Sequence, residues 1–391
     1  MSTFMAASSR EGKQLHDAVF QFGQAAQAAM AAYGRERVVN ATVGCYAGED
    51  EVLGCLPVVE EIYRSLPMAD FITYAPPVGL ADYRKAAIDE TFEAYRPEGY
   101  IDAVATAGGT GAVHIAIANY SEVGDDVLAS DWRWGIYGSL CQEIGRRLTT
   151  FALLDESGAF NIESFSSAVA DVLRKQDSLL IILNTPANNP TGFALSDQDW
   201  AEVLQVCRFH EKQGKRISIL VDIAYIAYAG EKNEVRTFMK QFSNLPPHLF
   251  IMAAFSMSKG YTLYGQRAGA LVGVSSSEDV IKEFTELGRY SARTSWSNVN
   301  RAAMTLLRGD AALTKRLDEE RMEFFRIIQQ RASLFTEEAA QCGLRVIPYH
   351  AGFFISIPTA NPQAVCEALQ DELVFAAPLA LGVRLGVCSV P

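Results

Sequence analysis

Short apolar runs alternate with longer stretches of helical period between residues 100 and 275. This alternation predicts parallel β/α units. Each run is almost entirely apolar, as expected for strands that helices cover on both faces. The predicted strands are residues 102–107, 126–130, 178–184, 217–223, 249–255 and 268–274. We therefore expect one large α/β domain in the middle of the chain.

The pattern changes after Arg308. A single apolar stripe then predicts a long amphipathic helix through Leu317, Phe324, Ile328 and Phe335. An Ala-rich stretch at residues 14–33 is also expected to be helical. We predict an N-terminal arm with part of the small domain at 1–52, a large domain at 53–308 and a smaller α+β domain at 309–391.

Composition excludes several classes of protein. The 391 residues carry 34 Lys and Arg against 46 Asp and Glu, so the formal charge is −12 and no broad positive field is available for nucleic acid. No apolar run approaches the roughly 18 residues of a membrane helix. The histidines show no ligand spacing, so we expect no metal site, and seven cysteines without a CxxC pair indicate reduced core thiols. We expect a cytoplasmic protein.

Motifs follow several predicted strands, at the sheet edge where open α/β folds bind ligands. GGTGA at 108–112 opens a helix whose amides favour a phosphate, although the motif taken alone is better explained by a tight strand-to-helix turn. NPTG at 189–192 is either a ligand loop or a plain turn. Asp222 and Tyr225 end another strand, where a buried acid needs a partner, unless it caps the next helix.

Ser256-Met257-Ser258-Lys259 ends the predicted strand at 249–255. Apolar surroundings favour the neutral lysine, an amine nucleophile that can form an imine. Ser-x-x-Lys also occurs in serine acyl-transferases, but the Lys-Thr-Gly and Ser-Asp-Asn tripeptides of that class are absent. Taken together, the motifs fit an aldehyde cofactor with a phosphate and a pyridine nitrogen, which is pyridoxal phosphate.

With these motifs, the sequence resembles the fold-type I pyridoxal-phosphate aminotransferases of class I/II, most closely the aspartate and aromatic amino acid aminotransferase group. The resemblance implies a large, mostly parallel seven-stranded sheet domain with helices on both faces, and a smaller α+β domain. It covers roughly residues 40–384. Besides the motifs above, it rests on Gly44-Cys45-Tyr46, Tyr74, Trp134, Asn188, Arg267, Arg293 and Arg384.

The resemblance implies roles for the motif residues. Lys259 would hold the cofactor as a Schiff base and move the proton at the substrate α carbon, while Asp222 would keep the pyridine nitrogen protonated. Tyr225 and Asn189 would hydrogen-bond the phenolic oxygen, and Trp134 would stack on the ring. The phosphate would be held by Gly108, Gly109, Thr110, Ser256 and Arg267.

The resemblance also implies a substrate site that two subunits share. Arg384 would bind the α-carboxylate, and the backbone near Gly44 would close over it. Arg293 aligns with an arginine that reaches a second carboxylate across a dimer interface, and Tyr74 with a tyrosine that contacts the neighbouring subunit's phosphate. We therefore expect an obligate homodimer.

The sequence departs from the family at three places. Tyr137 stands where the group commonly has a histidine behind Asp222, and Asn184 replaces another histidine, so tuning of the ring nitrogen is expected to differ. The chain ends seven residues after Arg384, where relatives usually continue into another helix. The small domain is therefore expected to be trimmed or packed differently at its end.

These features predict an amino acid aminotransferase with a ping-pong mechanism, in which an aspartate-like or aromatic amino acid passes its amino group to 2-oxoglutarate. Arg293 favours dicarboxylates, but the same arginine can swing aside for aromatic side chains, so the donor stays open. A lyase or decarboxylase on this fold would use Lys259 and Asp222 equally. A transcription-regulator sensor would need a winged helix ahead of the domain, and residues 1–39 leave little room for it.

Overall fold

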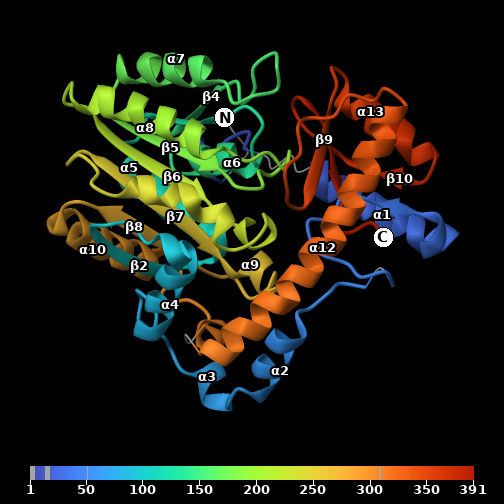
Figure 1. Ribbon diagram of the computed structural model, residues 1–391, viewed down its shortest axis with the longest axis horizontal. Helices are drawn as coiled ribbons and strands as arrows, with labels where there is room; N and C mark the ends of the chain where they lie inside the picture. The colour runs from blue at the N-terminus through green and yellow to red at the C-terminus, as the bar shows by residue number, and fades with distance from the viewer. Residues whose placement is uncertain (1–4, 14–17, 51, 308–309) are drawn as a thin grey trace.

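A seven-stranded sheet forms the centre of the structure, a computed structural model that describes residues 5–13, 18–50, 52–307 and 310–391 (Figure 1). The strand order is β2-β8-β7-β6-β5-β3-β4. Only β8 runs antiparallel to its neighbours, and the other pairs are parallel. The strands are β2 (Tyr100–Ala107), β3 (Asp126–Ser130), β4 (Arg147–Phe151), β5 (Ser178–Asn184), β6 (Arg216–Asp222), β7 (Leu249–Ser256) and β8 (Ala268–Ser275).

Six of these seven strands were predicted from apolar runs, and the mostly parallel sheet is confirmed. The prediction missed β4, whose sequence is Arg-Leu-Thr-Thr-Phe and in which only Phe151 is buried. Because β4 lies at the edge of the sheet, its polar side chains remain in contact with solvent. An edge strand of this kind lacks the continuous apolar signal of a central strand.

Helices cover both faces of the sheet, as the alternation of strand side chains requires. In β5, Leu179, Ile181 and Leu183 belong to one core cluster, whereas Leu180 and Ile182 belong to another. The first cluster includes residues of α4 (Ala81–Phe92), α7 (Ile162–Leu173) and α8 (Asp197–Glu211). The second includes residues of α5 (Gly108–Tyr120), α6 (Ile136–Glu143) and α10 (Glu278–Ser295).

A smaller α+β unit combines residues 18–40 with the C-terminal part of the chain, on the right in Figure 1. An antiparallel sheet of order β11-β12-β9 forms its centre, and β1 pairs in parallel with β10. Helix α1 packs against β10 and β11. The elements are α1 (Ala18–Tyr33), β1 (Val39–Asn40), β9 (Phe354–Pro358), α13 (Pro362–Asp371), β10 (Val374–Phe375), β11 (Ala377–Pro378) and β12 (Gly382–Gly386).

The predicted amphipathic helix is α12 (Ala311–Gln341), in which Leu317 and Ile328 are buried. It runs from the smaller unit to the region of α2 (Pro57–Ser65) and α3 (Met68–Ile72) in Figure 1. Two further helices, α9 (Met257–Gly260) and α11 (Arg301–Leu306), are short. The boundaries predicted at 52 and 308 stay predictions, and residues 308–309, like 14–17 of the first predicted helix, lie outside the described residues.

The expectation of core thiols was only partly correct. All seven cysteines are free, but Cys55 and Cys342 are exposed and Cys45 is half-buried. Within the described ranges, no three His, Cys, Asp or Glu side chains form a group that could hold a metal ion. None of the described helices is both long and apolar enough to cross a membrane.

Candidate active site

The carboxyl ends of β5 and β6 lie beside the turn that carries Lys259 (residues 256–261, called the lysine turn below), because β6 pairs with both β5 and β7. Asp222 is the last residue of β6, and the NPTG loop follows β5. Lys259 lies on α9, which begins directly after β7. Helix α5 begins directly after β2, next to the end at which β8 begins. The sheet thus brings together the segments that the sequence motifs had singled out.

An anion cradle lies between α5 and α9. The exposed Arg267 donates from Nη2 to Thr110 Oγ1 and from Nη1 to Ser258 Oγ, both at 3.3 Å. Gly108 has φ +69°, and a Cβ there would lie 2.8 Å from Arg267 Nη2. A Cβ at Gly109 would approach Ser256 Cβ to 3.3 Å. A helix N-terminus beside a guanidinium fits a phosphate group.

The Lys259 amine is enclosed by aromatic rings and a backbone carbonyl. Nζ donates to the Gly44 carbonyl at 2.5 Å and lies 4.7 Å from the ring centre of Tyr264 and 5.5 Å from that of Tyr225. Burial lowers the pKa of Lys259, while the nearby Cys45 thiol opposes this shift. A lowered pKa increases the fraction of neutral amine, which is the nucleophilic form.

Asp222 is buried and held by two hydrogen bonds. Tyr137 Oη donates to Oδ2 at 2.5 Å, and the Ala224 amide donates to Oδ1 at 3.1 Å. Burial raises the pKa of Asp222, and both hydrogen bonds oppose that rise. Asn184 Nδ2 donates to the Asp222 backbone carbonyl at 2.8 Å. The two residues that depart from the family pattern therefore both contact Asp222, one at its carboxylate and one at its backbone.

A chain of hydrogen bonds joins Arg384 to Tyr225. Arg384 Nη1 donates to Asn189 Oδ1 at 3.2 Å, and Asn189 Nδ2 donates to Tyr225 Oη at 3.4 Å. Arg384 also donates from Nη2 to the Thr42 carbonyl at 2.9 Å, and its guanidinium lies 4.1 Å from the ring centre of Phe354. Burial raises the pKa of the Tyr225 phenol, so it remains protonated at neutral pH.

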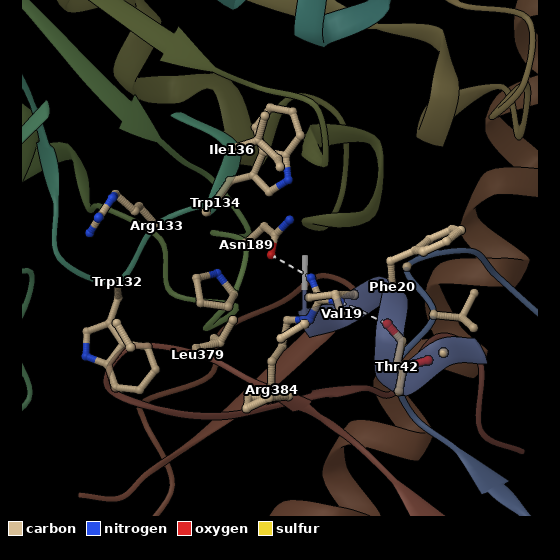
Figure 2. Close-up of a pocket in the computed structure, with 18 of the residues that line it drawn as sticks. Val19, Phe20, Thr42, Trp132, Arg133, Trp134, Ile136, Asn189, Leu379 and Arg384 are labelled. Atoms are coloured by element: carbon tan, nitrogen blue, oxygen red, sulfur yellow. Dashed lines mark hydrogen bonds between the residues drawn. The ribbon is translucent and has the colours of Figure 1, made fainter. Parts of the chain in front are cut away.

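A cavity of about 800 Å³ opens beside Arg384 (Figure 2). Four residues predicted from the sequence line it: Gly44, Trp134, Asn189 and Arg384. Figure 2 shows Asn189 and Arg384 facing each other, with the guanidinium of Arg133 turned away from both. Lys259 and Asp222 are not among the lining residues, but Gly44, which accepts the Lys259 hydrogen bond, is.

Sequence reasoning missed part of this cavity wall. Phe20 of α1, Trp132 after β3 and Leu379 after β11 all line the cavity. Helix α1 was predicted, but nothing in its Ala-rich sequence indicated that it would face Arg384. These side chains reach the cavity because the tertiary fold brings their segments together, so no local sequence motif identifies them.

Two of the predicted residues that do not line the cavity, Tyr74 and Arg293, are exposed at the surface. Tyr74 follows α3 and its side chain is 85% exposed. Arg293 is exposed near the end of α10 and donates to the Ser297 hydroxyl. Neither side chain lines the cavity of its own chain.

Residues 36–382 match the protein family described as Aminotransferase class I and II. A solved aminotransferase from Anaerococcus prevotii is 38% identical, with a TM-score of 0.96 over 99% of this chain and 95% of that chain. The aromatic-amino-acid aminotransferase of Burkholderia pseudomallei, covalently bound to pyridoxal phosphate, has a TM-score of 0.79 at 23% identity over 100% of this chain and 96% of that one, and shows the same fold.

Curated relatives agree with this family. The aromatic-amino-acid aminotransferase of Pseudomonas aeruginosa is 27% identical over 284 residues, which are 70% of this chain and 68% of that protein. The mitochondrial aspartate aminotransferase of Gallus gallus is 25% identical over 271 residues, 66% of this chain and 61% of that protein. The chain therefore belongs to the aminotransferase class I and II family and is an aminotransferase that uses pyridoxal phosphate.

Proposed function

We propose that this aminotransferase moves amino groups from an amino acid to 2-oxoglutarate in two alternating half-reactions at Lys259. One observation carries the proposal: the partly buried amine of Lys259, whose pKa is lowered, bonds to the Gly44 carbonyl in the wall of a cavity that also contains Arg384. An amine nucleophile and a buried guanidinium are the two groups that an α-amino acid needs at its nitrogen and its carboxylate.

The residues at the sheet edge fit the cofactor. When bound, pyridoxal phosphate supplies an aldehyde that condenses with an amine and releases water, and a ring that accepts electrons from the substrate α carbon. Arg267, Thr110, Ser256 and the amides of Gly108 and Gly109 would hold its phosphate. Asp222 would pair with the ring nitrogen. Asn189 and Tyr225 would hydrogen-bond the phenolic oxygen, and Trp134 would stack on the face of the ring.

Lys259 and Arg384 would divide the work on the substrate. Lys259 Nζ, in its neutral form, would take the proton from the substrate α carbon and pass it to the aldehyde carbon of the cofactor. Arg384 holds the α-carboxylate by a charge-assisted contact and so orients the α carbon. The donor and the acceptor both carry this carboxylate, so both half-reactions depend on Arg384.

The apolar residues in the cavity wall favour amino donors with aromatic or other large apolar side chains. Phe20, Trp132 and Leu379 line the space beside Arg384 and offer apolar surface rather than charge. Burying a large apolar side chain against such a wall contributes about 1.5–3 kcal/mol. The second carboxylate of 2-oxoglutarate would meet Arg293 of a second subunit.

A homodimer with shared active sites is part of this proposal. Met68, Phe71, Ile72 and Tyr74 are all exposed within one short stretch at α3, and exposed apolar residues that gather in this way favour an interface. Tyr74 and Arg293, both exposed, would complete the neighbouring subunit's site. The cytoplasmic location expected from the sequence stays a prediction.

Borohydride reduction of the holoenzyme followed by peptide mapping tests the assignment of Lys259. We expect one reduced adduct, at Lys259, and none in Lys259→Ala, which should keep its fold but lose turnover. Lys282→Ala, at an exposed lysine of α10, should keep both adduct and turnover. After the first half-reaction, further release of 2-oxo acid should require an amino acceptor. Repeated turnover without an acceptor would indicate a lyase or decarboxylase, and an unmodified Lys259 would refute the proposal.

A further inference from the structure

The helix that carries Lys259 is too short to hold its own position. Helix α9 spans only Met257–Gly260, and a single turn has little stability in isolation. On one side of the lysine, Ser256 Oγ accepts the Ser258 amide at 3.2 Å and Arg267 contacts the Ser258 hydroxyl. These contacts belong to the anion cradle. Something else must hold the other side, at Gly260 and Tyr261.

Arg321 of α12 provides that support. Its Nε donates to the Gly260 carbonyl at 2.5 Å, and its Nη2 donates to Glu90 Oε1 of α4 at 2.8 Å. The guanidinium lies 4.5 Å from the ring centre of Tyr261, whose hydroxyl donates to the other Glu90 oxygen. The two residues that follow Lys259 are thus held in a closed cluster, which consists of Gly260, Tyr261, Arg321 and Glu90.

The cluster is buried and closely packed. Arg321 is only 6% exposed, and a Cβ at Gly260 would come within 3.2 Å of both Arg321 Nη2 and Ala227 Cβ. Asp318 approaches Arg321 Nη1 at 3.8 Å. There is thus little space for Gly260 to shift without displacing the guanidinium.

Stability alone does not account for a buried ion pair of this kind. Desolvation opposes the Coulomb attraction, and well-packed apolar residues in its place are often as stable or more so. What the charged groups add is direction, because a guanidinium bonded to one carbonyl and one carboxylate accepts few orientations. The carbonyl that it selects is one residue from Lys259.

We propose that Arg321 is a positioning residue for Lys259, a role that rests on the proposed function of that lysine. It fixes Gly260, the last residue of α9, and so the direction in which the lysine side chain leaves the backbone. Arg321 is not among the residues that line the substrate cavity, and it acts only through Gly260 and Tyr261. Because it lies on α12, it also ties the lysine turn to the helix that reaches the smaller unit (Figure 1).

The test replaces both charges, Arg321→Met together with Glu90→Gln, so that no lone charge remains buried. We expect kcat to fall about tenfold or more, since small misplacement of a reacting group is costly, while KM for the donor changes less than about twofold. Hydroxylamine should release the cofactor from the holoenzyme about tenfold faster, because a less ordered lysine competes less well for the aldehyde. Circular dichroism checks the fold.

Arg316→Met with Glu61→Gln is the matched control, because that pair also joins α12 to another helix but is largely exposed. It should leave both readouts unchanged. If the Arg321 double variant does not fold, Tyr261→Phe, which removes only the hydroxyl donor to Glu90, should still accelerate cofactor release. Wild-type kcat and release rate in the folded double variant, or an unchanged release rate in Tyr261→Phe, would overturn the inference. Failure of wild type to form an adduct at Lys259 would instead overturn the proposed function.

Discussion

The Tyr137 hydroxyl donates a hydrogen bond to the Asp222 carboxylate, in a place where this enzyme group commonly has a histidine. Burial raises the pKa of the Tyr137 phenol well above its ordinary value, and Asp222 raises it further. The phenol therefore remains a donor throughout the working pH range, whereas an imidazole changes its charge near neutrality. Tyr137 also packs edge-on against Trp134, with ring centres 5.5 Å apart.

Tyr137→Phe should weaken the proposed function of Asp222. Loss of a hydrogen bond to a charged group costs about 1.5–3 kcal/mol, so we expect kcat/KM to fall about tenfold to 100-fold. The hydrogen bond lowers the pKa of Asp222, so the variant's Asp222 pKa rises further and the acid limb of the pH profile moves to higher pH. Tyr83→Phe is the control, because its buried hydroxyl has no hydrogen-bond partner among the described residues. An unmoved acid limb would contradict the prediction.

The Lys259 pKa predicts selective labelling at moderate pH. Because burial lowers the pKa of Lys259, its amine should be neutral at pH values where exposed lysines are still protonated. Lys282 is an internal control, because its hydrogen bond to Glu278 raises its pKa. In cofactor-free protein treated with pyridoxal phosphate and borohydride, labelling should reach half its maximum at lower pH for Lys259 than for Lys282. Peptide mapping measures both, and the reverse order would contradict the lowered pKa.

Arg384→Lys should impair both half-reactions. A lysine keeps the charge but loses the planar, two-pronged contact with a carboxylate. We expect kcat/KM for donor and acceptor to fall about 100-fold, which corresponds to about 2.7 kcal/mol. Single-turnover kinetics of each half-reaction measure the loss. A loss confined to one half-reaction would argue against a shared carboxylate site.

Arg293→Ala should distinguish acidic from aromatic substrates. If Arg293 reaches a second carboxylate in the neighbouring subunit, its loss should cost aspartate and glutamate a few kcal/mol and leave tyrosine, phenylalanine and tryptophan much less affected. Arg289→Ala is a matched control on the same helix, where the arginine pairs with Glu286 at the surface. Equal losses for both donor classes would contradict this role of Arg293.

Phe20→Ala should impair aromatic donors selectively. Removing the ring takes apolar surface from the cavity wall, so KM for aromatic donors should rise about tenfold, while that for aspartate changes little. Phe209→Ala, at an exposed phenylalanine of α8, is the control. A donor panel with 2-oxoglutarate measures the effect, and an equal rise for aspartate would show that Phe20 does not select the side chain.

The central strands and the motifs at their ends could be predicted from the sequence, because short local patterns encode them. Central strands such as β5 and β7 are continuous apolar runs, and the motifs at their ends stay beside one another because the strands are neighbours of β6. The half-polar edge strand β4 lacks that signal. The cavity wall at Phe20 and the support of Gly260 by Arg321 join segments far apart in the chain, and no short motif encodes such a contact.

A single stretch of main chain connects the two chemical ends of the site. The Thr42 carbonyl accepts Arg384, and the Gly44 carbonyl, two residues later, accepts Lys259. Because these carbonyls lie only two positions apart along the chain, we expect a change in this short stretch of backbone to disturb both contacts together. Any effect of occupancy at the lysine amine on carboxylate affinity at Arg384 would be matched by an equal effect in the reverse direction.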